Sequence, residues 1–466
     1  MSKLLLQSNA LQLPMRERSV HCIVTSPPYF HQRSYQTAKW IGGDLDCDHK
    51  TALHPNRFSY PVSDKQFSNT GSGFSVWDKI CPTCGAERHD AQIGQEETHD
   101  CMGWATNDPC GKCYICHIRE VARELYRVLR NDGTLWLNIG DSHNGSGGAG
   151  GDYNVHGFRA GQKRYSGTRM DGVKPKSMLM IPARVAMALE RDGWYLRVAI
   201  PWIKRNAYVE GVFDRPTTKI EYIYMLAKSR IYYYDHIAVL KEYKTALNRW
   251  GGELMHPPAQ AGWDNATGQT SNREGRKVRP NKEGRNARPQ DWFFDSMRAI
   301  LSGDDMLMLD DQANPMALIV NTESSGVPHY ATYPPSLVRP FIIASTSEKG
   351  VCADCGAPIE RIRIRDGKIQ QRFQKNSSPS PYREGGMVNV YKTSGWQKTC
   401  NCATDKTKES IVFDPFIGSG TTCVVAEQLG RHGVGVDLST EYLRTAESRV
   451  KNVELPMLEL LKRGTT

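Results

Sequence analysis

The chain has 466 residues, enough for about two or three domains, and 39% of them are hydrophobic. It contains no apolar run of membrane-spanning length and residues 1–15 lack a signal-peptide pattern, so we expect a soluble cytoplasmic protein without a membrane partner. The formal charge of +10 favours a polyanionic partner.

Strand and helix patterns alternate through the first half of the chain. Residues 4–13 and 20–24 predict a short strand, a connector and a second strand that ends at Thr25-Ser26-Pro27-Pro28-Tyr29. The next predicted elements are a helix at 117–130, a strand at 134–139, a helix at 179–191, a strand at 194–203 and a hairpin of 220–227 with 231–234. This rhythm predicts an α/β fold with a mostly parallel sheet and an antiparallel edge.

Three segments interrupt this alternation of predicted strands and helices. Residues 31–116 are polar and then cysteine-rich, residues 242–326 are polar and partly basic, and residues 351–402 are bounded by cysteines. Residues 411–450 return to strand, glycine loop, helix, strand and helix.

The corner that follows the second strand has the chemistry of a binding site. Two consecutive prolines fix the backbone and remove two donors, which lets Ser26, the nearby carbonyls and the Tyr29 ring surround a small planar group. Alone, the same five residues also suit an edge turn with a surface tyrosine.

A second motif, Asp414-Pro415-Phe416-Ile417-Gly418-Ser419-Gly420-Thr421-Thr422, lies nearly four hundred residues later. Glycines allow close backbone approach, and a helix that starts near Thr421 offers free N–H groups to an anion. Asp437 ends the following strand, where an acid could bind two ribose hydroxyls. These residues alone would also suit a nicotinamide dinucleotide as the ligand.

Together the two motifs resemble the amino-group DNA methyltransferases, which methylate cytosine N4 or adenine N6 with S-adenosylmethionine (SAM). The corner precedes the glycine loop, as in the beta arrangement of that family. The resemblance implies a Rossmann-like mixed seven-stranded sheet with an antiparallel edge hairpin and a DNA-recognition region. The expected α/β fold adds zinc-binding insertions, which lie outside the common core of the family. Zinc-bearing chains of this kind look like phage or prophage members.

The resemblance also implies the site residues. The catalytic residues would be Ser26, Pro27, Pro28 and Tyr29, with the Ser26 hydroxyl and the Pro27 carbonyl accepting from the amino group of a flipped base that stacks on Tyr29. Serine at the first position favours cytosine N4 over adenine N6. The implied cofactor-binding residues are Asn9, Thr25, His329, Ala331, Thr332, Pro334, Asp414, Pro415, Phe416, Gly418, Ser419, Gly420, Thr421, Thr422, Asp437 and Leu438. Asn9 stands where family members often carry an acid.

The chain has 13 cysteines, several paired as C-x-x-C, and without a secretory signal this favours metal ligands over disulfides. Three structural zinc sites are predicted, with iron–sulfur ligation or free thiols as alternatives. The sets are Cys47, His49, Cys81 and Cys84; Cys101, Cys110, Cys113 and Cys116; and Cys352, Cys355, Cys400 and Cys402. Cys22 and Cys423 stand in apolar runs and are expected to be packing residues.

Residues 242–326 lie where the family places its DNA-reading region. Basic residues within them suit phosphate contacts with double-stranded DNA, although a solvated linker would have a similar composition. They are Arg273, Arg276, Lys277, Arg279, Lys282, Arg285 and Arg288.

These patterns divide the chain into five parts. The catalytic part of the core is expected at 1–30 and 117–241, a zinc-binding insertion at 31–116, the target-recognition region at 242–326, the SAM-binding part at 327–350 and 403–466, and a zinc-ribbon-like insertion at 351–402. We expect a site-specific DNA methyltransferase, monomeric or homodimeric, that could serve beside a cognate restriction endonuclease. The competing interpretations are adenine N6 methylation, methylation of a protein glutamine or RNA, and a DNA-binding protein with an inactive methyltransferase core.

Overall fold

The computed structural model of the chain describes 17 stretches of sequence. They are residues 4–30, 39–44, 46–47, 80–81, 83–89, 91–94, 96, 101, 103–106, 108–144, 172–204, 215, 218, 220–238, 318–320, 333–370 and 387–453. Among these residues no helix is both long and apolar enough to cross a membrane.

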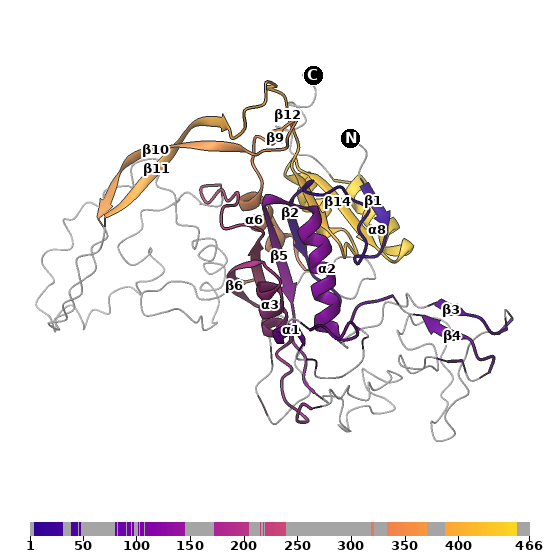
Figure 1. Ribbon diagram of the computed structural model, residues 1–466. Coiled ribbons are helices and arrows are strands. Elements are labelled where there is room, and N and C mark those ends of the chain that lie inside the picture. The colour runs from indigo at the N-terminus through magenta and orange to yellow at the C-terminus, as the bar shows by residue number, and fades with distance from the viewer. Residues whose placement is uncertain are drawn as a thin grey trace, which may run out of the picture.

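A twisted mixed sheet forms the centre of the molecule (Figure 1). Its strands, in spatial order, are β1 (Leu4–Gln7), β14 (His432–Asp437), β13 (Ile411–Asp414), β2 (Val20–Thr25), β5 (Leu129–Ile139), β7 (Ile220–Ala227), β6 (Tyr195–Ile203) and β8 (Leu318–Ile319). Pairings from β1 to β5 are parallel, and β7 runs antiparallel to both β5 and β6. The predicted mixed seven-stranded sheet is therefore present, and the two-residue β8 extends its edge in parallel with β6.

Helices cover both faces of the sheet because successive residues of each strand point to opposite sides. On one face, Ile23 and Leu135 join a buried cluster with α2 (Tyr114–Val128) and α3 (Ile181–Arg191). On the other, Val24 and Trp136 pack with α6 (Pro335–Ser345) and α7 (Thr421–Gln428). The remaining helices are α1 (Gly103–Thr106) and α8 (Thr440–Lys451).

The predicted hairpin of 220–227 with 231–234 is wrong. Residues 231–234 form no strand, and β7 instead pairs with β5 and β6. The backbone N–H of Tyr233 donates to the Asp132 carbonyl at 2.8 Å, and Ile231 is 75% exposed. The tyrosine-rich run thus follows the end of the sheet, where Tyr232 and Tyr234 pack against the α6 face.

The insertions form small β units outside the central sheet. Strands β3 (Lys39–Ile41) and β4 (Glu87–His89) pair with each other, as do β9 (Val351–Cys352) and β12 (Thr407–Lys408). The ribbon of β10 (Ile359–Gln370) and β11 (Met387–Lys398) reaches away from the sheet (Figure 1).

Candidate active site and cysteine clusters

The Ser26–Tyr29 corner lies at the carboxyl end of β2, between β13 and β5. Pro27 is buried, while Ser26, Pro28 and Tyr29 are partly exposed. In a parallel sheet this edge is where ligands bind, because loops from neighbouring strands meet there.

A polar network from three neighbouring strands holds the Tyr29 ring. The Tyr29 hydroxyl donates to Glu221 Oε2 at 2.6 Å and accepts from Asn138 Nδ2 at 2.8 Å. Lys204 forms an ion pair with the other oxygen of Glu221. The edge of the Tyr29 ring lies so close to Gly140 that an added Cβ there would be 2.7 Å from it. Burial, and then the Glu221 carboxylate, raise the pKa of Tyr29 well above its ordinary value.

Sequence reasoning missed Asn138, Lys204 and Glu221. Each is a polar residue near the end of an otherwise apolar strand, which is a usable signal, but only the strand order β5-β7-β6 brings them together. Asn138 also donates to Ser26 Oγ at 3.5 Å. Its buried Oδ1 has no hydrogen-bond partner within the part of the chain that the structure describes.

Asp414, which is itself buried, is the centre of a second network. Its carboxylate accepts from Thr25 Oγ1 at 2.7 Å, from Thr422 Oγ1 at 2.8 Å and from the Tyr333 hydroxyl at 2.9 Å. Thr422 also donates to the Val24 carbonyl at 3.2 Å. These bonds tie the end of β2 to the start of α7, so Thr25, Asp414 and Thr422 fix the relative position of the corner and the glycine loop.

The glycine loop folds over the end of β14. The Gly418 N–H donates to Asp437 Oδ2 at 3.0 Å, and the Ser439 N–H donates to Asp437 Oδ1 at 2.9 Å. Gly420 has φ +87 and lies against α8, where an added Cβ would be 2.9 Å from that of Ala446. Burial raises the pKa of Asp437. Each carboxylate oxygen keeps a further lone pair for a ligand hydroxyl.

The corner and the loop line one pocket that is open to solvent and has an empty volume, open solvent included, of about 650 Å³. Its lining residues are Ser8, Asn9, Ala10, Ser26, Pro28, Ala91, Gln92, Ile93, Pro415, Phe416, Gly418, Asp437, Leu438 and Tyr442. Residues 91–93 belong to the first insertion and were not expected here. Their segment of the sequence has neither a motif nor a period that marks it.

The predicted cofactor residues divide into three groups. Asn9, Pro415, Phe416, Gly418, Asp437 and Leu438 line the pocket, whereas Thr25, Pro334, Asp414, Ser419, Gly420, Thr421 and Thr422 do not. His329, Ala331 and Thr332 lie outside the described residues, as do His49 and the basic residues 273–288. Asn9 Oδ1 accepts from the Leu11 N–H at 3.0 Å, and Ser419 Oγ accepts from Arg449 at 2.8 Å.

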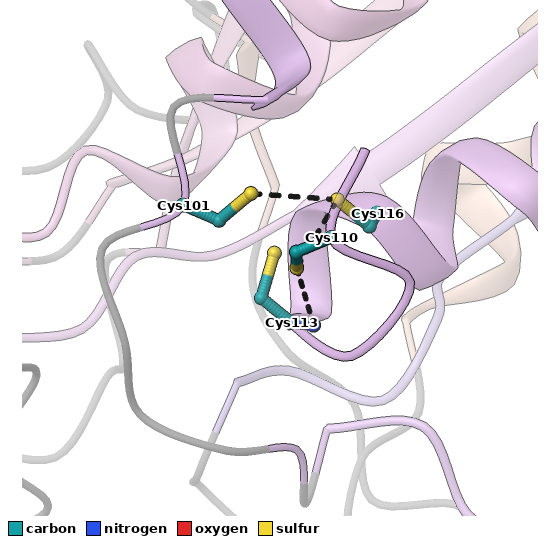
Figure 2. Close-up of side chains that lie close together, drawn as sticks. All are labelled: Cys101, Cys110, Cys113 and Cys116. Carbon is teal, nitrogen blue, oxygen red and sulfur yellow. Dashed lines mark hydrogen bonds between the residues drawn. The ribbon is translucent and has the colours of Figure 1, made fainter. Parts of the chain in front are cut away.

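The structure brings the predicted cysteine sets together. We call Cys47, Cys81 and Cys84 the first cluster, Cys101, Cys110, Cys113 and Cys116 the second, and Cys352, Cys355, Cys400 and Cys402 the third. Within each cluster all sulfur atoms lie within 4.8 Å of one another. Four thiolates at such spacing are the donor set of a closed tetrahedral zinc site. Figure 2 shows the second cluster at the start of α2.

Comparison with known sequences decides the family. A family model described as DNA methylase, of the N6/N4 type, matches residues 20–356 and 399–448. The chain belongs to this DNA methylase family. The prediction made from the corner and the glycine loop is thus confirmed at the level of the family, which covers both amino-methylated bases.

Type II methyltransferases are among the relatives of this DNA methylase. It is 28% identical over 354 residues to the type II methyltransferase M.Cfr9I of Citrobacter freundii, and the aligned region covers 74% of each chain. It is 27% identical over 337 residues to the type II methyltransferase M.SmaI of Serratia marcescens, and the aligned region covers 72% of this chain and 74% of M.SmaI. Among solved structures, the cytosine-N4-specific PvuII DNA methyltransferase is 11% identical, with a TM-score of 0.42 over 99% of this chain and 91% of that chain.

Proposed function

We propose that this DNA methylase transfers a methyl group from SAM to the exocyclic amino group of a flipped base in duplex DNA, with cytosine N4 as the favoured target. The observation that carries the proposal is the shared pocket: Ser26 and Pro28 of the corner line the same space as Gly418 and Asp437 of the glycine loop. A methyl donor held by the loop would therefore lie beside the residues that hold the acceptor.

The lining of the pocket has the chemistry to bind the methyl donor. Small-molecule sites combine an apolar lining with a few polar groups, and the lining of this pocket has that composition. Phe416 and Ile93 offer apolar surface for an adenine ring. Asp437 offers a carboxylate for ribose hydroxyls, and Asn9 offers a side-chain amide at the same pocket.

The corner supplies acceptors for the amino group. A base amino group is a weak nucleophile because its lone pair is delocalised into the ring, and SAM supplies an electrophilic methyl group. Hydrogen bonds from the amino N–H groups to Ser26 Oγ and the Pro27 carbonyl would direct the lone pair at the methyl carbon. Such positioning is worth up to about 7–11 kcal/mol in well-oriented reactions.

Tyr29 provides the surface on which the flipped base stacks. Its ring is fixed by the bonds to Glu221 and Asn138, so the stacking plane exists before DNA binds. A preformed plane avoids the ordering cost that a mobile ring would add to base flipping.

Ser26 at the first position of the corner supports cytosine N4, and adenine N6 is the alternative. Residues 242–326 would read the target sequence, and the relatedness to type II enzymes supports a cognate restriction endonuclease as partner. The proposal also includes the division of the chain into five parts, in which residues 1–30 and 117–241 form the catalytic part of the core and residues 327–350 and 403–466 form its SAM-binding part.

The test is transfer of labelled methyl from SAM to duplex DNA, followed by mass spectrometry of the nucleosides. N4-methylcytosine is expected, and N6-methyladenine would establish the alternative base. Transfer to a protein or RNA substrate, or SAM binding without any transfer to DNA, would refute the proposal.

A further inference from the structure

The second cysteine cluster is joined to the proposed active site by short, direct contacts. We propose that this cluster binds a Zn²⁺ ion, and that the ion holds the Pro28 carbonyl and one wall of the pocket in position through Tyr114 and through Glu96. The claim about the pocket rests on the function proposed above, because it takes the pocket as the site of the methyl donor.

The spacing of the sulfur atoms matches zinc. The Sγ atoms of Cys101 and Cys116 are 3.7 Å apart, as are those of Cys110 and Cys116. Zinc–thiolate bonds of about 2.3 Å in a tetrahedron place their sulfur atoms about 3.8 Å apart. A disulfide would require about 2.05 Å, so these distances describe a ligand set and not a bonded pair.

Backbone N–H groups complete the surroundings of these sulfur atoms. The Gly103 N–H donates to Cys101 Sγ at 3.3 Å, and the N–H groups of Lys112 and Cys113 each donate to Cys110 Sγ at 3.4 Å. Such donors stabilise the thiolate form that zinc binds. Cys113 is the residue immediately before α2, so a metal ion here fixes where that helix begins.

The first link to the active site is Tyr114. It is the first residue of α2 and is only 2% exposed. Its hydroxyl donates to the Pro28 carbonyl at 2.9 Å, and its ring packs on that of Phe30 with centroids 5.4 Å apart. The helix start that the metal ion would fix therefore also holds the peptide between Pro28 and Tyr29.

The second link reaches the pocket wall. His117, one turn into α2, contacts Glu96 Oε1 through Nδ1 at 3.1 Å and donates from Nε2 to the Gly111 carbonyl at 3.1 Å. Glu96 Oε2 accepts from the Gly94 N–H at 2.8 Å. Glu96 thereby ties the segment that follows Ala91, Gln92 and Ile93 to the helix that carries the cluster.

Gly94 shows how closely this segment lies against the corner. It has φ +98, and a Cβ added there would be 2.9 Å from the Tyr29 carbonyl oxygen and 3.3 Å from that of Pro28. The wall and the corner are thus in backbone contact, and both are attached to α2 within its first turn. If the start of α2 moved, both would move with it.

Two ligand variants separate this role from a general effect of zinc. Cys110→Ser removes an exposed ligand of the second cluster, and Cys355→Ser removes an exposed ligand of the third, so neither creates a core cavity. Each purified full-length variant is examined for zinc content, hydrogen exchange and SAM affinity. Both are expected to lose one zinc ion per chain relative to the unchanged protein.

Only Cys110→Ser should loosen the active site. We expect hydrogen exchange at residues 91–94 and 28–30 to be about tenfold faster or more, and SAM to bind about tenfold more weakly. Cys355→Ser should keep both properties within about twofold. Equal effects of the two variants, unchanged exchange in zinc-depleted Cys110→Ser, or unchanged zinc content in Cys110→Ser would each overturn the proposal.

Tyr114→Phe tests the first link in a chain that keeps all its cysteines. It should retain zinc and SAM affinity but slow methyl transfer about three- to tenfold, the amount that one neutral hydrogen bond is worth. Full transfer activity would remove Tyr114 from the proposal. If the unchanged protein binds no SAM, the proposed function fails, while zinc content and hydrogen exchange still decide whether the cluster holds the corner.

Discussion

Tyr29→Phe removes one hydroxyl from the proposed base-stacking residue and leaves the ring in place. That hydroxyl bonds the Glu221 carboxylate at 2.6 Å and Asn138 at 2.8 Å. A hydrogen bond to a charged group contributes about 1.5–3 kcal/mol. If the whole of that loss falls on the orientation of the ring in the transition state, transfer slows about 10- to 150-fold.

The assay is single-turnover transfer of labelled methyl to duplex DNA, with SAM affinity measured separately by calorimetry. SAM affinity should not change, because Tyr29 is not among the residues that line the pocket. Tyr126→Phe is the matched control: its hydroxyl lies 3.5 Å from the Lys228 carbonyl, at the opposite end of β5 from Asn138. It should transfer methyl at the original rate.

Glu221→Gln tests whether the two residues act together. The double variant with Tyr29→Phe should be less impaired than the sum of the two single effects, with a coupling of about 1 kcal/mol or more. Full transfer activity in Tyr29→Phe would refute the reasoning. So would a loss of SAM affinity as large as the loss of rate, because the hydroxyl would then support the pocket as a whole.

Four further outcomes are expected. Asp437→Ala should weaken SAM binding by about 10- to 100-fold in calorimetry, and unchanged affinity would remove it from the cofactor site. Metal analysis should find about two to three zinc ions per chain, whereas no zinc with every thiol titratable in the native protein would contradict the cluster assignments. Burial lowers the pKa of His21 from 6.5 to about 4, so as the pH falls the unfolded chain binds a proton at this residue before the folded chain does. The free energy of unfolding should therefore fall by up to about 3 kcal/mol as the pH drops from 6.5 to 4. His21→Gln should flatten that part of the pH profile of denaturation. Neutralising two or three basic residues within 273–288 should weaken binding to all DNA sequences alike and reduce the salt slope by roughly 0.9 per lost contact, whereas a changed target sequence would make them base readers.

The strands and the family could be predicted because both are encoded locally. Buried parallel strands appear in a sequence as short, mainly apolar runs. Such runs at residues 20–24, 134–139 and 411–414 predicted β2, the second half of β5 and β13. The corner and the glycine loop are each contiguous in sequence, so their chemistry could be recognised before their contact was known.

What could not be predicted depends on which strands become neighbours. Residues 220–227 were expected to pair with 231–234, but β7 lies between β5 and β6, and no local pattern encodes that order. The same order assembles Asn138, Lys204 and Glu221 around Tyr29. The pocket wall at 91–93 was missed for a related reason: the segment is held by the contact of Glu96 with His117 of α2 and by the close approach of Gly94 to the corner, and no periodic apolar pattern marks it.

The pairing of β13 with β2 has a consequence for the order in which the protein assembles. Thr25 and Asp414 are hydrogen-bonded across 389 residues, and β13 lies between β2 and β14 in the middle of the sheet. During synthesis β2, β5, β6 and β7 therefore leave the ribosome long before their central partner exists. Until then β2, whose six residues are all buried in the finished fold, has one unpaired edge. Contacts so distant in sequence form slowly. We therefore expect a chain that stops short of residue 411 to be inactive and prone to aggregate, and methylation to start only after the corner and the glycine loop have been joined.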